Sequence, residues 1–269
     1  MKSIVVANWK MNPTTMREAK KLFDATRKAA ETAKSVSVIV APPSIFLREL
    51  RARYKGKRIA FAIQSANAEG GGAYTGDTSL LQAKDAGAQY VIAGHSEQRA
   101  KGETNEVAGK VVAAALVSGL TPVLCVGERE RSPSGEHFNF VKEQLRAAFA
   151  DVEPGKVTKV LVAYEPVWAI GGEKSMSPRD MHEMTIFIRK TIVGMKGETG
   201  LRHAEAGSDH AKAGMNIKIL YGGATTESNA LPMLQESGAQ GFIVGHVSID
   251  AYRFAALLEA IRYPSRSNT

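Results

Sequence analysis

The sequence predicts an α/β fold, a closed (β/α)8 barrel in a single domain, from two observations. Eight short runs are almost continuous in apolar character, as expected for parallel strands that are covered on both faces. Segments with helical periodicity lie between these runs and are joined to them by short connections. This alternation favours a parallel sheet with crossover helices. Barrels of roughly 250 residues commonly form one domain, so a chain of 269 residues does not require two. Before the polar residues are considered, a doubly wound open sheet remains an alternative.

The predicted strands run in order along the chain, and a helix is expected after each of them. The strands are Ile4–Ala7, Val36–Ala41, Ile59–Ile63, Tyr90–Ala93, Pro122–Val126, Val160–Tyr164, Ile217–Tyr221 and Phe242–Val244. Eight is the number of strands that this kind of barrel needs to close.

The expected helices begin at recognisable capping patterns. Thr15 and Glu18 resemble a capping box at the start of the first helix. Ser177 supplies a cap for a later helix, with Pro178 in its first turn and Asp180 as an early acidic residue. The other helices are expected over Ser44–Tyr54, Ser79–Ala86, Thr104–Ser118, Phe138–Phe149, Glu227–Glu236 and Ile249–Ile261.

The segment Gly194–Met215, rich in Gly, Lys, Glu, His and Asp, interrupts this alternation of strand and helix. Its apolar period is weak, so we expect a surface insertion at about 194–215, before the seventh strand. His203 and His210 lie within it, and we interpret them as exposed loop histidines rather than metal ligands. The single domain is expected to span residues 1–269.

The chain carries a formal net charge of +8, which raises the question of a nucleic-acid partner. Lysines and arginines are scattered between apolar helix positions, and the densest stretch, Arg48 to Arg58, falls on an expected helix and turn. No basic run is interleaved with aromatic residues, so we expect no nucleic-acid binding. A positive surface would instead help to attract an anionic substrate.

Cysteine content and hydropathy indicate a cytoplasmic protein. Cys125 is the single cysteine, which excludes an internal disulfide, and no Cys/His spacing suits zinc. The chain opens almost at once with a strand, so we expect no secretory signal. No apolar stretch reaches about 18 residues, so no membrane span is expected either.

Polar side chains gather directly after the predicted strands, where barrels of this kind place their active sites. Asn8 and Lys10 follow the first strand, His95 and Glu97 the fourth, and Glu165 the sixth. A carboxylate, an imidazole and an ammonium at one mouth suit the enolisation of a carbonyl compound. The carboxylate removes a carbon-bound proton, the imidazole polarises the oxygen, and the ammonium offsets the negative charge that develops.

Glycines follow the last two strands, in Gly222-Gly223-Ala224 and Gly245-His246. Glycine lets backbone N–H groups approach a phosphate closely. Taken singly these features are ambiguous, because a histidine after a strand is commonly structural and a Gly-Gly pair is commonly a turn. Their joint placement at several strand ends is what favours a site that enolises a phosphorylated carbonyl compound.

Several segments resemble the triosephosphate isomerases, in order and over nearly the whole chain. The segments are Ala7–Asn12 (ANWKMN), Gly72–Gly76 (GAYTG), Ala93–Glu97 (AGHSE), Cys125–Glu128 (CVGE) and Ala163–Gly171 (AYEPVWAIG). The resemblance implies a TIM barrel that interconverts dihydroxyacetone phosphate and D-glyceraldehyde 3-phosphate through an enediolate. It also implies a place in glycolysis and gluconeogenesis, and no metal or organic cofactor.

Residue by residue, the resemblance implies that Glu165 is the base and His95 the electrophile, kept neutral by a helix N-terminus. Lys10 would stabilise negative charge, Asn8 would help to shape the oxyanion site, and Glu97 would support the site from behind. The residues implied to bind substrate and its phosphate are Asn8, Lys10, Gly171, Ala224, Gly245 and His246. Cys125 is interpreted as a buried structural residue rather than a nucleophile.

The segment Pro166–Met176 resembles the lid of this family. Its closure is expected to place the N–H of Gly171 over the phosphate and to exclude water, with Trp168 as a packing anchor. The lid residues are Pro166, Val167, Trp168, Ala169, Ile170, Gly171, Gly172, Glu173, Lys174, Ser175 and Met176.

Three positions depart from the family pattern. Glu173 stands where the lid usually has a glycine, Ala224 replaces a serine, and His246 replaces the second of two glycines. We expect Glu173 to point to solvent, because a carboxylate beside a phosphate dianion would weaken binding, and a protonated His246 would offset such a charge. The departures leave room for a longer ketose phosphate, such as a tetrulose phosphate, as the alternative substrate.

The resemblance also implies a homodimer formed through the loop Ala66–Ser79, with Thr75 fixing Asn8 and Lys10 of the neighbouring subunit. A barrel that binds phosphorylated ligands without catalysis is a further alternative. The intact Lys10, His95 and Glu165 argue against it.

Overall fold

The computed structural model describes residues 2–170, 175–198 and 216–262. Eight parallel strands close into a barrel in chain order, so each strand pairs with its neighbours in the sequence and β8 pairs with β1. The strands are β1 Ser3–Asn8, β2 Val36–Ala41, β3 Ile59–Ile63, β4 Tyr90–Ala93, β5 Thr121–Val126, β6 Leu161–Tyr164, β7 Lys218–Tyr221 and β8 Gly241–Val244. The predicted barrel is confirmed, and the open-sheet alternative is wrong.

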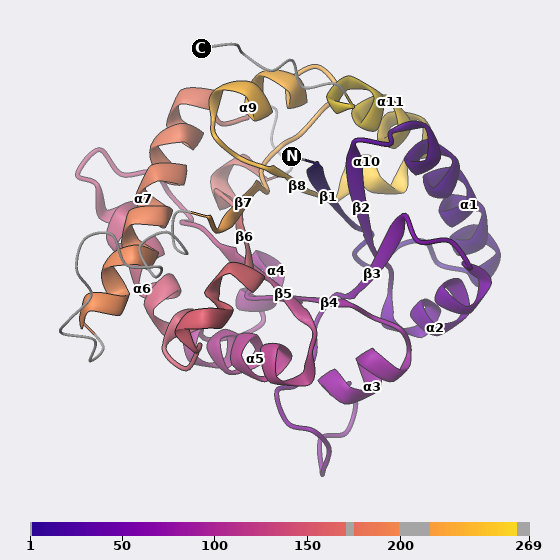
Figure 1. Ribbon diagram of the computed structural model, residues 1–269, viewed down its shortest axis with the longest axis horizontal. Helices are drawn as coiled ribbons and strands as arrows, with labels where there is room; N and C mark the ends of the chain where they lie inside the picture. Colours follow the sequence, from indigo (N-terminus) through magenta and orange to yellow (C-terminus); the bar gives the residue numbers. More distant parts are fainter. Residues whose placement is uncertain (1, 171–174, 199–215, 263–269) are drawn as a thin grey trace.

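Helices surround the barrel as an outer ring (Figure 1). They are α1 Met16–Thr32, α2 Ser44–Arg53, α3 Leu80–Asp85, α4 Ser96–Arg99, α5 Asn105–Ser118, α6 Glu136–Phe149, α7 Pro178–Glu198, α9 Ala230–Glu236, α10 His246–Ile249 and α11 Ala251–Ile261, with 3-10 turns η1 Pro154–Lys159 and η2 Val167–Ala169. None of the helices that the structure describes is long and apolar enough to cross a membrane.

Alternation along each strand divides the core into two layers. In β1, Val6 belongs to a cluster made of strand residues, which fills the barrel, whereas Val5 packs with helix residues such as Phe23 and Leu47 outside it. Successive side chains of a strand point to opposite faces, so a strand covered on both faces is apolar at every position. The near-continuous apolar runs of the sequence therefore follow directly from the closed barrel.

The predicted caps hold two helices in place. The hydroxyl of Thr15 accepts the N–H of Glu18 at 3.2 Å, and that of Ser177 accepts the N–H of Asp180 at 3.1 Å. The Glu18 carboxylate, however, accepts the hydroxyl of Thr14 at 3.2 Å instead of reaching back to the cap. Only half of the predicted capping box is therefore formed at α1.

Two of the differences between predicted and observed helix boundaries have a clear local cause. The helix expected from Ile249 is divided, because Asp250 is extended and its carboxylate caps α11, so α10 ends before it. The helix expected from Glu227 begins at Ala230, because Thr226 and Asn229 exchange hydrogen bonds between side chain and backbone in a turn.

The predicted insertion lies largely outside the described residues. Residues 194–198 of it belong to α7, which continues four residues beyond the expected start at Gly194. Residues 199–215, with His203 and His210, are not described, so the insertion stays a prediction there. Within the described ranges, no group of three or more His, Cys, Asp and Glu side chains is placed to hold a metal ion.

Candidate active site

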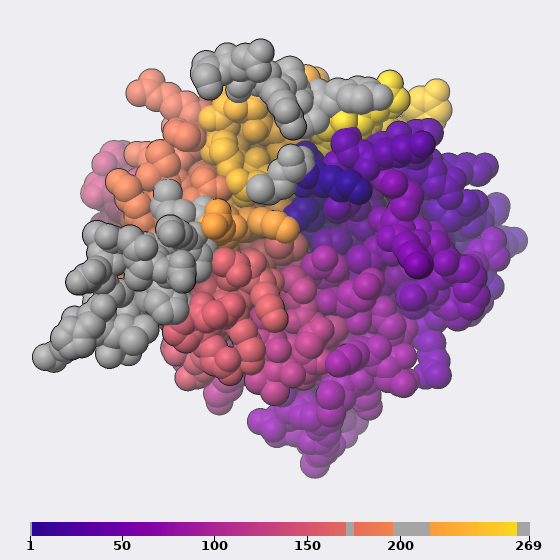
Figure 2. All heavy atoms as spheres, viewed as in Figure 1, coloured from indigo at the N-terminus to yellow at the C-terminus, as the bar shows by residue number. Residues whose placement is uncertain are grey.

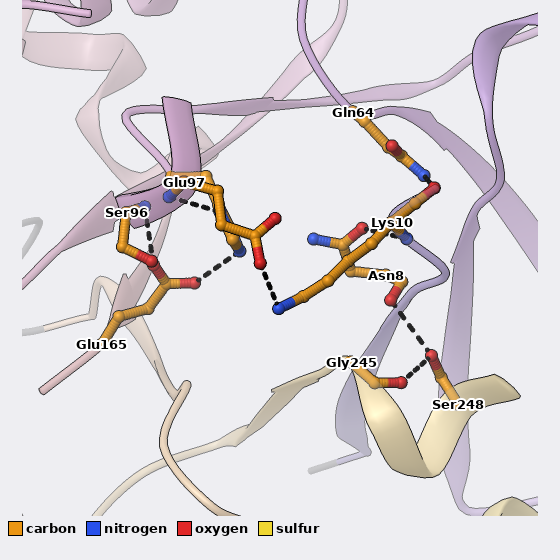
Figure 3. Close-up of polar contacts among 9 residues, drawn as sticks. Asn8, Lys10, Gln64, Ser96, Glu97, Glu165, Gly245 and Ser248 are labelled. Atoms are coloured by element: carbon orange, nitrogen blue, oxygen red, sulfur yellow. Dashed lines mark hydrogen bonds and ion pairs between the residues drawn. The ribbon is translucent and has the colours of Figure 1, made fainter. Parts of the chain in front are cut away.

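A cavity of about 240 Å³ opens at the C-terminal ends of the strands and brings most of the predicted site residues together. It is lined by Asn8, Lys10, His95, Glu165, Ile170, Gly222, Gly223, Ala224, Thr225, Thr226, Ile243, Val244, Gly245, His246, Val247 and Arg253. Figure 3 shows Lys10, Glu97 and Glu165 reaching from different elements towards a common space. Gly171 is outside the described residues.

Glu165 directly follows β6 and is almost fully buried, at 3% exposed. One oxygen, Oε2, accepts the N–H of Ser96 at 3.3 Å, and the other, Oε1, lies 3.4 Å from Nε2 of His95. Two glycines make room for this residue. A Cβ on Gly222 would lie 2.5 Å from Cγ of Glu165, and a Cβ on Gly127 would lie 1.9 Å from its carbonyl oxygen. The carboxylate is therefore held from several sides.

His95 is buried and precedes α4 as its N-cap. Its Nδ1 accepts the N–H of Glu97 at 3.2 Å, so this nitrogen carries no proton. The proton of the neutral imidazole therefore lies on Nε2, the nitrogen next to Glu165. This arrangement makes His95 a hydrogen-bond donor on the side of the carboxylate, as an electrophile for a carbonyl oxygen requires.

Lys10 adopts a left-handed backbone conformation, with φ of 54°. Such a conformation costs a non-glycine residue of order 1–3 kcal/mol and persists where the surroundings hold it. Asn8 Oδ1 accepts the N–H of Lys10 at 3.0 Å, and Gln64 Nε2 donates to its carbonyl at 2.8 Å (Figure 3). A Cβ on Gly245 would lie 2.9 Å from Cε of Lys10, so a glycine at this position leaves room for the Lys10 side chain.

Glu97 forms an ion pair with Lys10, with 2.6 Å between Oε1 and Nζ. Partial burial raises the pKa of Glu97, but the hydrogen bond and charge of Lys10 lower it by more, helped by His95 and Lys101. The pKa is thus below its ordinary value, and Glu97 stays ionised at neutral pH. The carboxylate thereby orients the ammonium group at the mouth of the cavity.

Ser248 connects α10 to β1 on the β8 side of the cavity. Its hydroxyl lies 2.6 Å from the carbonyl of Gly245 and 3.2 Å from that of Asn8 (Figure 3). Neither Ser248 nor Gln64 is among the site residues predicted from the sequence. Both act through backbone carbonyls that come together only in the folded barrel, so no motif marks them.

The described ends of the predicted lid are attached to the barrel. Glu128 is buried and accepts the hydroxyl of Tyr164 at 2.8 Å and the indole N–H of Trp168 at 2.9 Å. At the far end, the N–H of Met176 donates to the hydroxyl of Tyr221 at 3.1 Å. Burial, and then the charge and hydrogen bond of Glu128, raise the pKa of Tyr164 far above its ordinary value. The Glu128 carboxylate, which had no predicted role, is thus the anchor for Trp168.

The central part of the lid, Gly171, Gly172, Glu173 and Lys174, lies outside the described residues, so the expected direction of Glu173 stays a prediction. Ala224 is described, and its N–H donates to the carbonyl of Ala169 at 2.9 Å. This backbone bond connects the lid to the loop after β7 where the family resemblance would have supplied a serine hydroxyl.

Cys125 is fully buried in the barrel interior, in agreement with its structural interpretation. Burial raises the pKa of its thiol well above the ordinary value, and the neighbouring Glu165 carboxylate raises it further. A thiol in such surroundings is a poor nucleophile.

Comparisons with known proteins agree with this geometry. Residues 3–261 match the family model described as triosephosphate isomerase. The triosephosphate isomerase of Roseiflexus sp. (strain RS-1) is 38% identical over 257 residues, which cover 95% of this chain and 96% of the relative. Those of Thermoanaerobacter sp. (strain X514) and Endomicrobium trichonymphae are 36% and 34% identical, and the matches cover 95% and 96% of this chain and 98% of each relative. The chain therefore belongs to the triosephosphate isomerase family.

Proposed function

We propose that this chain interconverts dihydroxyacetone phosphate and D-glyceraldehyde 3-phosphate, as an isomerase of glycolysis and gluconeogenesis. The observation that carries the proposal is that Glu165, His95 and Lys10 line one cavity, each from a different strand end. At about 240 Å³ the cavity is below the range of roughly 300–1,000 Å³ usual for drug-sized ligands, which suits a small sugar phosphate.

The reaction moves one proton between neighbouring carbons. Glu165 takes a proton from the carbon next to the carbonyl, while His95 donates its Nε2 proton to the carbonyl oxygen, giving the enediol or enediolate. Lys10 and Asn8 offset the charge on the oxygens. The proton then returns from Glu165 to the neighbouring carbon and His95 recovers its own, so the product is an isomer and no co-reactant is consumed.

The loops after β7 and β8 form the phosphate end of the cavity in this proposal. Ala224, Gly245 and His246 line it, and Gly171 would approach from the lid. The ammonium of Lys10 adds positive charge beside Gly245. Closure of the lid over this end would keep water from the enediolate.

We also propose a homodimer formed through the loop 66–79, with the enzyme working in the cytoplasm. This loop projects from the surface beside α3 (Figure 1, Figure 2) and exposes the ring of Tyr74. Within the loop, Asn67 Nδ2 donates to Asp77 Oδ2 at 2.6 Å, which supports its shape. Large apolar side chains elsewhere, Met11 and Ile45, are also exposed and would be covered by a second copy. Light scattering should give about twice the chain mass of 28.9 kDa; a monomeric mass would contradict the dimer.

A coupled assay with a small substrate panel tests the proposed reaction. Glyceraldehyde 3-phosphate should turn over much faster than a tetrulose phosphate, because the curated relatives carry the triosephosphate isomerase name. Turnover of the tetrulose phosphate without turnover of the triose would contradict the proposal. Such a result would direct attention to Ala224 and His246, which line the cavity and differ from the family pattern.

A further inference from the structure

The β8 side of the cavity carries two basic side chains that the mechanism above does not use as bases or acids. His246 is the first residue of α10, and Arg253 lies in the first turn of α11. Both line the cavity that holds Lys10 and Glu165, and both are exposed. Within residues 2–170, 175–198 and 216–262, neither side chain has a hydrogen-bond or ion-pair partner. The Lys10 ammonium, in contrast, is already paired with Glu97.

The backbone that carries Arg253 is held firmly although its side chain is exposed. Asp250 Oδ1 accepts the N–H groups of Tyr252 at 2.9 Å and of Arg253 at 3.0 Å, which fixes the start of α11. The next residue, Phe254, is fully buried in the core. Side chains in a helix lean towards its N-terminus, and α11 begins on the side of the barrel mouth, so Arg253 leans towards the cavity.

A guanidinium at this place has the chemistry to hold a phosphate. Arginine keeps its charge at all relevant pH values and presents a planar set of donors that matches two phosphate oxygens. We propose that Arg253, together with His246, binds the phosphate group of the substrate from the β8 side of the cavity. This inference rests on the proposed isomerase function, and it assigns to a side chain part of what the glycine loops would otherwise do through backbone N–H groups.

Replacing Arg253 by glutamine tests the assignment. The variant Arg253→Gln should raise KM for glyceraldehyde 3-phosphate about tenfold and leave kcat within about twofold, because the phosphate contact is the same in ground and transition states. The KM of Arg253→Lys should fall between those of the wild type and Arg253→Gln, since lysine keeps the charge and loses the paired donors. The control Lys28→Gln removes one positive charge from the exposed face of α1 and should leave KM unchanged.

Unphosphorylated glyceraldehyde separates a phosphate contact from a general disturbance of the site. If Arg253 binds the phosphate, kcat/KM for glyceraldehyde should be the same in the wild type and in Arg253→Gln. An equal loss on both substrates would overturn the assignment, and so would an unchanged KM for the phosphorylated one. Thermal unfolding of both proteins checks that the variant is folded.

Calorimetric titration with inorganic phosphate gives a readout that needs no turnover. The wild type should bind phosphate about tenfold more tightly than Arg253→Gln. Equal binding by the two proteins would contradict the inference, even in an active enzyme. A wild type that binds phosphate through Arg253 and isomerises no triose phosphate would contradict the proposed reaction and leave the phosphate contact standing.

Discussion

Glu165 and His95 at one side of the cavity are buried and held by several neighbours, whereas His246 and Arg253 at the β8 side are exposed and have no side-chain partner within the described residues. The difference matches the two tasks of the proposed reaction. Proton transfer requires positioned atoms and a site that excludes water, because small displacements of a base are costly. Capture of a dianion from solution instead favours accessible positive charge.

The position of Glu165 on the buried side depends on the space left by Gly222 as much as on hydrogen bonds. Gly222→Ala tests this directly. The added Cβ would lie 2.5 Å from Cγ of Glu165, so the carboxylate has to shift. We expect kcat to fall by about two orders of magnitude, the cost typical of a base displaced by about 1 Å. The coupled assay measures it.

Gly155→Ala is the matched control, because no atom lies within 4 Å of its added Cβ. It should retain the wild-type kcat. If Gly222→Ala were as active as this control, tight packing around Glu165 would not be what positions the base.

The hydrogen bonds of Glu128 with Tyr164 and Trp168 should contribute mainly to stability. Glu128→Gln weakens the hydrogen bonds from Tyr164 and Trp168 in a buried place, and we expect a loss of about 1–3 kcal/mol in the free energy of unfolding. Urea unfolding measures the loss. Glu130→Gln removes an exposed carboxylate two residues away and should change the free energy little; equal stabilities of the two variants would refute the anchoring role.

The Lys10–Glu97 ion pair should make a small, pH-dependent contribution to the free energy of unfolding. The pKa of Glu97 is lower in the folded protein, so its contribution is present above the ordinary pKa of about 4.3 and is lost as pH falls through the folded value. Because the side chain of Glu97 is 53% exposed, we expect no more than about 1 kcal/mol.

Urea unfolding of the wild type and Glu97→Gln at pH 7 and near pH 3 measures this contribution. The difference in the free energy of unfolding between the two proteins should be present at pH 7 and should shrink on acidification. A difference that grows at low pH would show that the ion pair is not its source.

The sequence predicted the features that repeat or that depend on neighbouring residues. Apolar runs located the strands, and their ends located Lys10, His95 and Glu165, because a parallel barrel brings all these ends to one mouth. The cap of α1 was predictable for a similar reason, because Thr15 and Glu18 lie close together in the sequence.

Features that depend on contacts between distant segments could not be predicted in this way. Gln64, which follows β3, reaches the carbonyl of Lys10 after β1, and Ser248 in α10 reaches that of Asn8. Arg253 resembles any exposed helix residue in the sequence, whereas in the fold α11 begins after the break at Asp250 and Arg253 lines the cavity. Gln64 and Ser248 thus contact the site through tertiary geometry rather than through a motif.

The most direct test of proton transfer by Glu165 is the coupled assay of glyceraldehyde 3-phosphate isomerisation by the wild type and by Glu165→Gln. We expect fast turnover by the wild type. Glutamine has nearly the shape of glutamate but is a very weak base, so kcat should be lower by two or more orders of magnitude in the variant, with an unchanged melting temperature. A variant that retains most of the wild-type kcat would show that Glu165 is not the base.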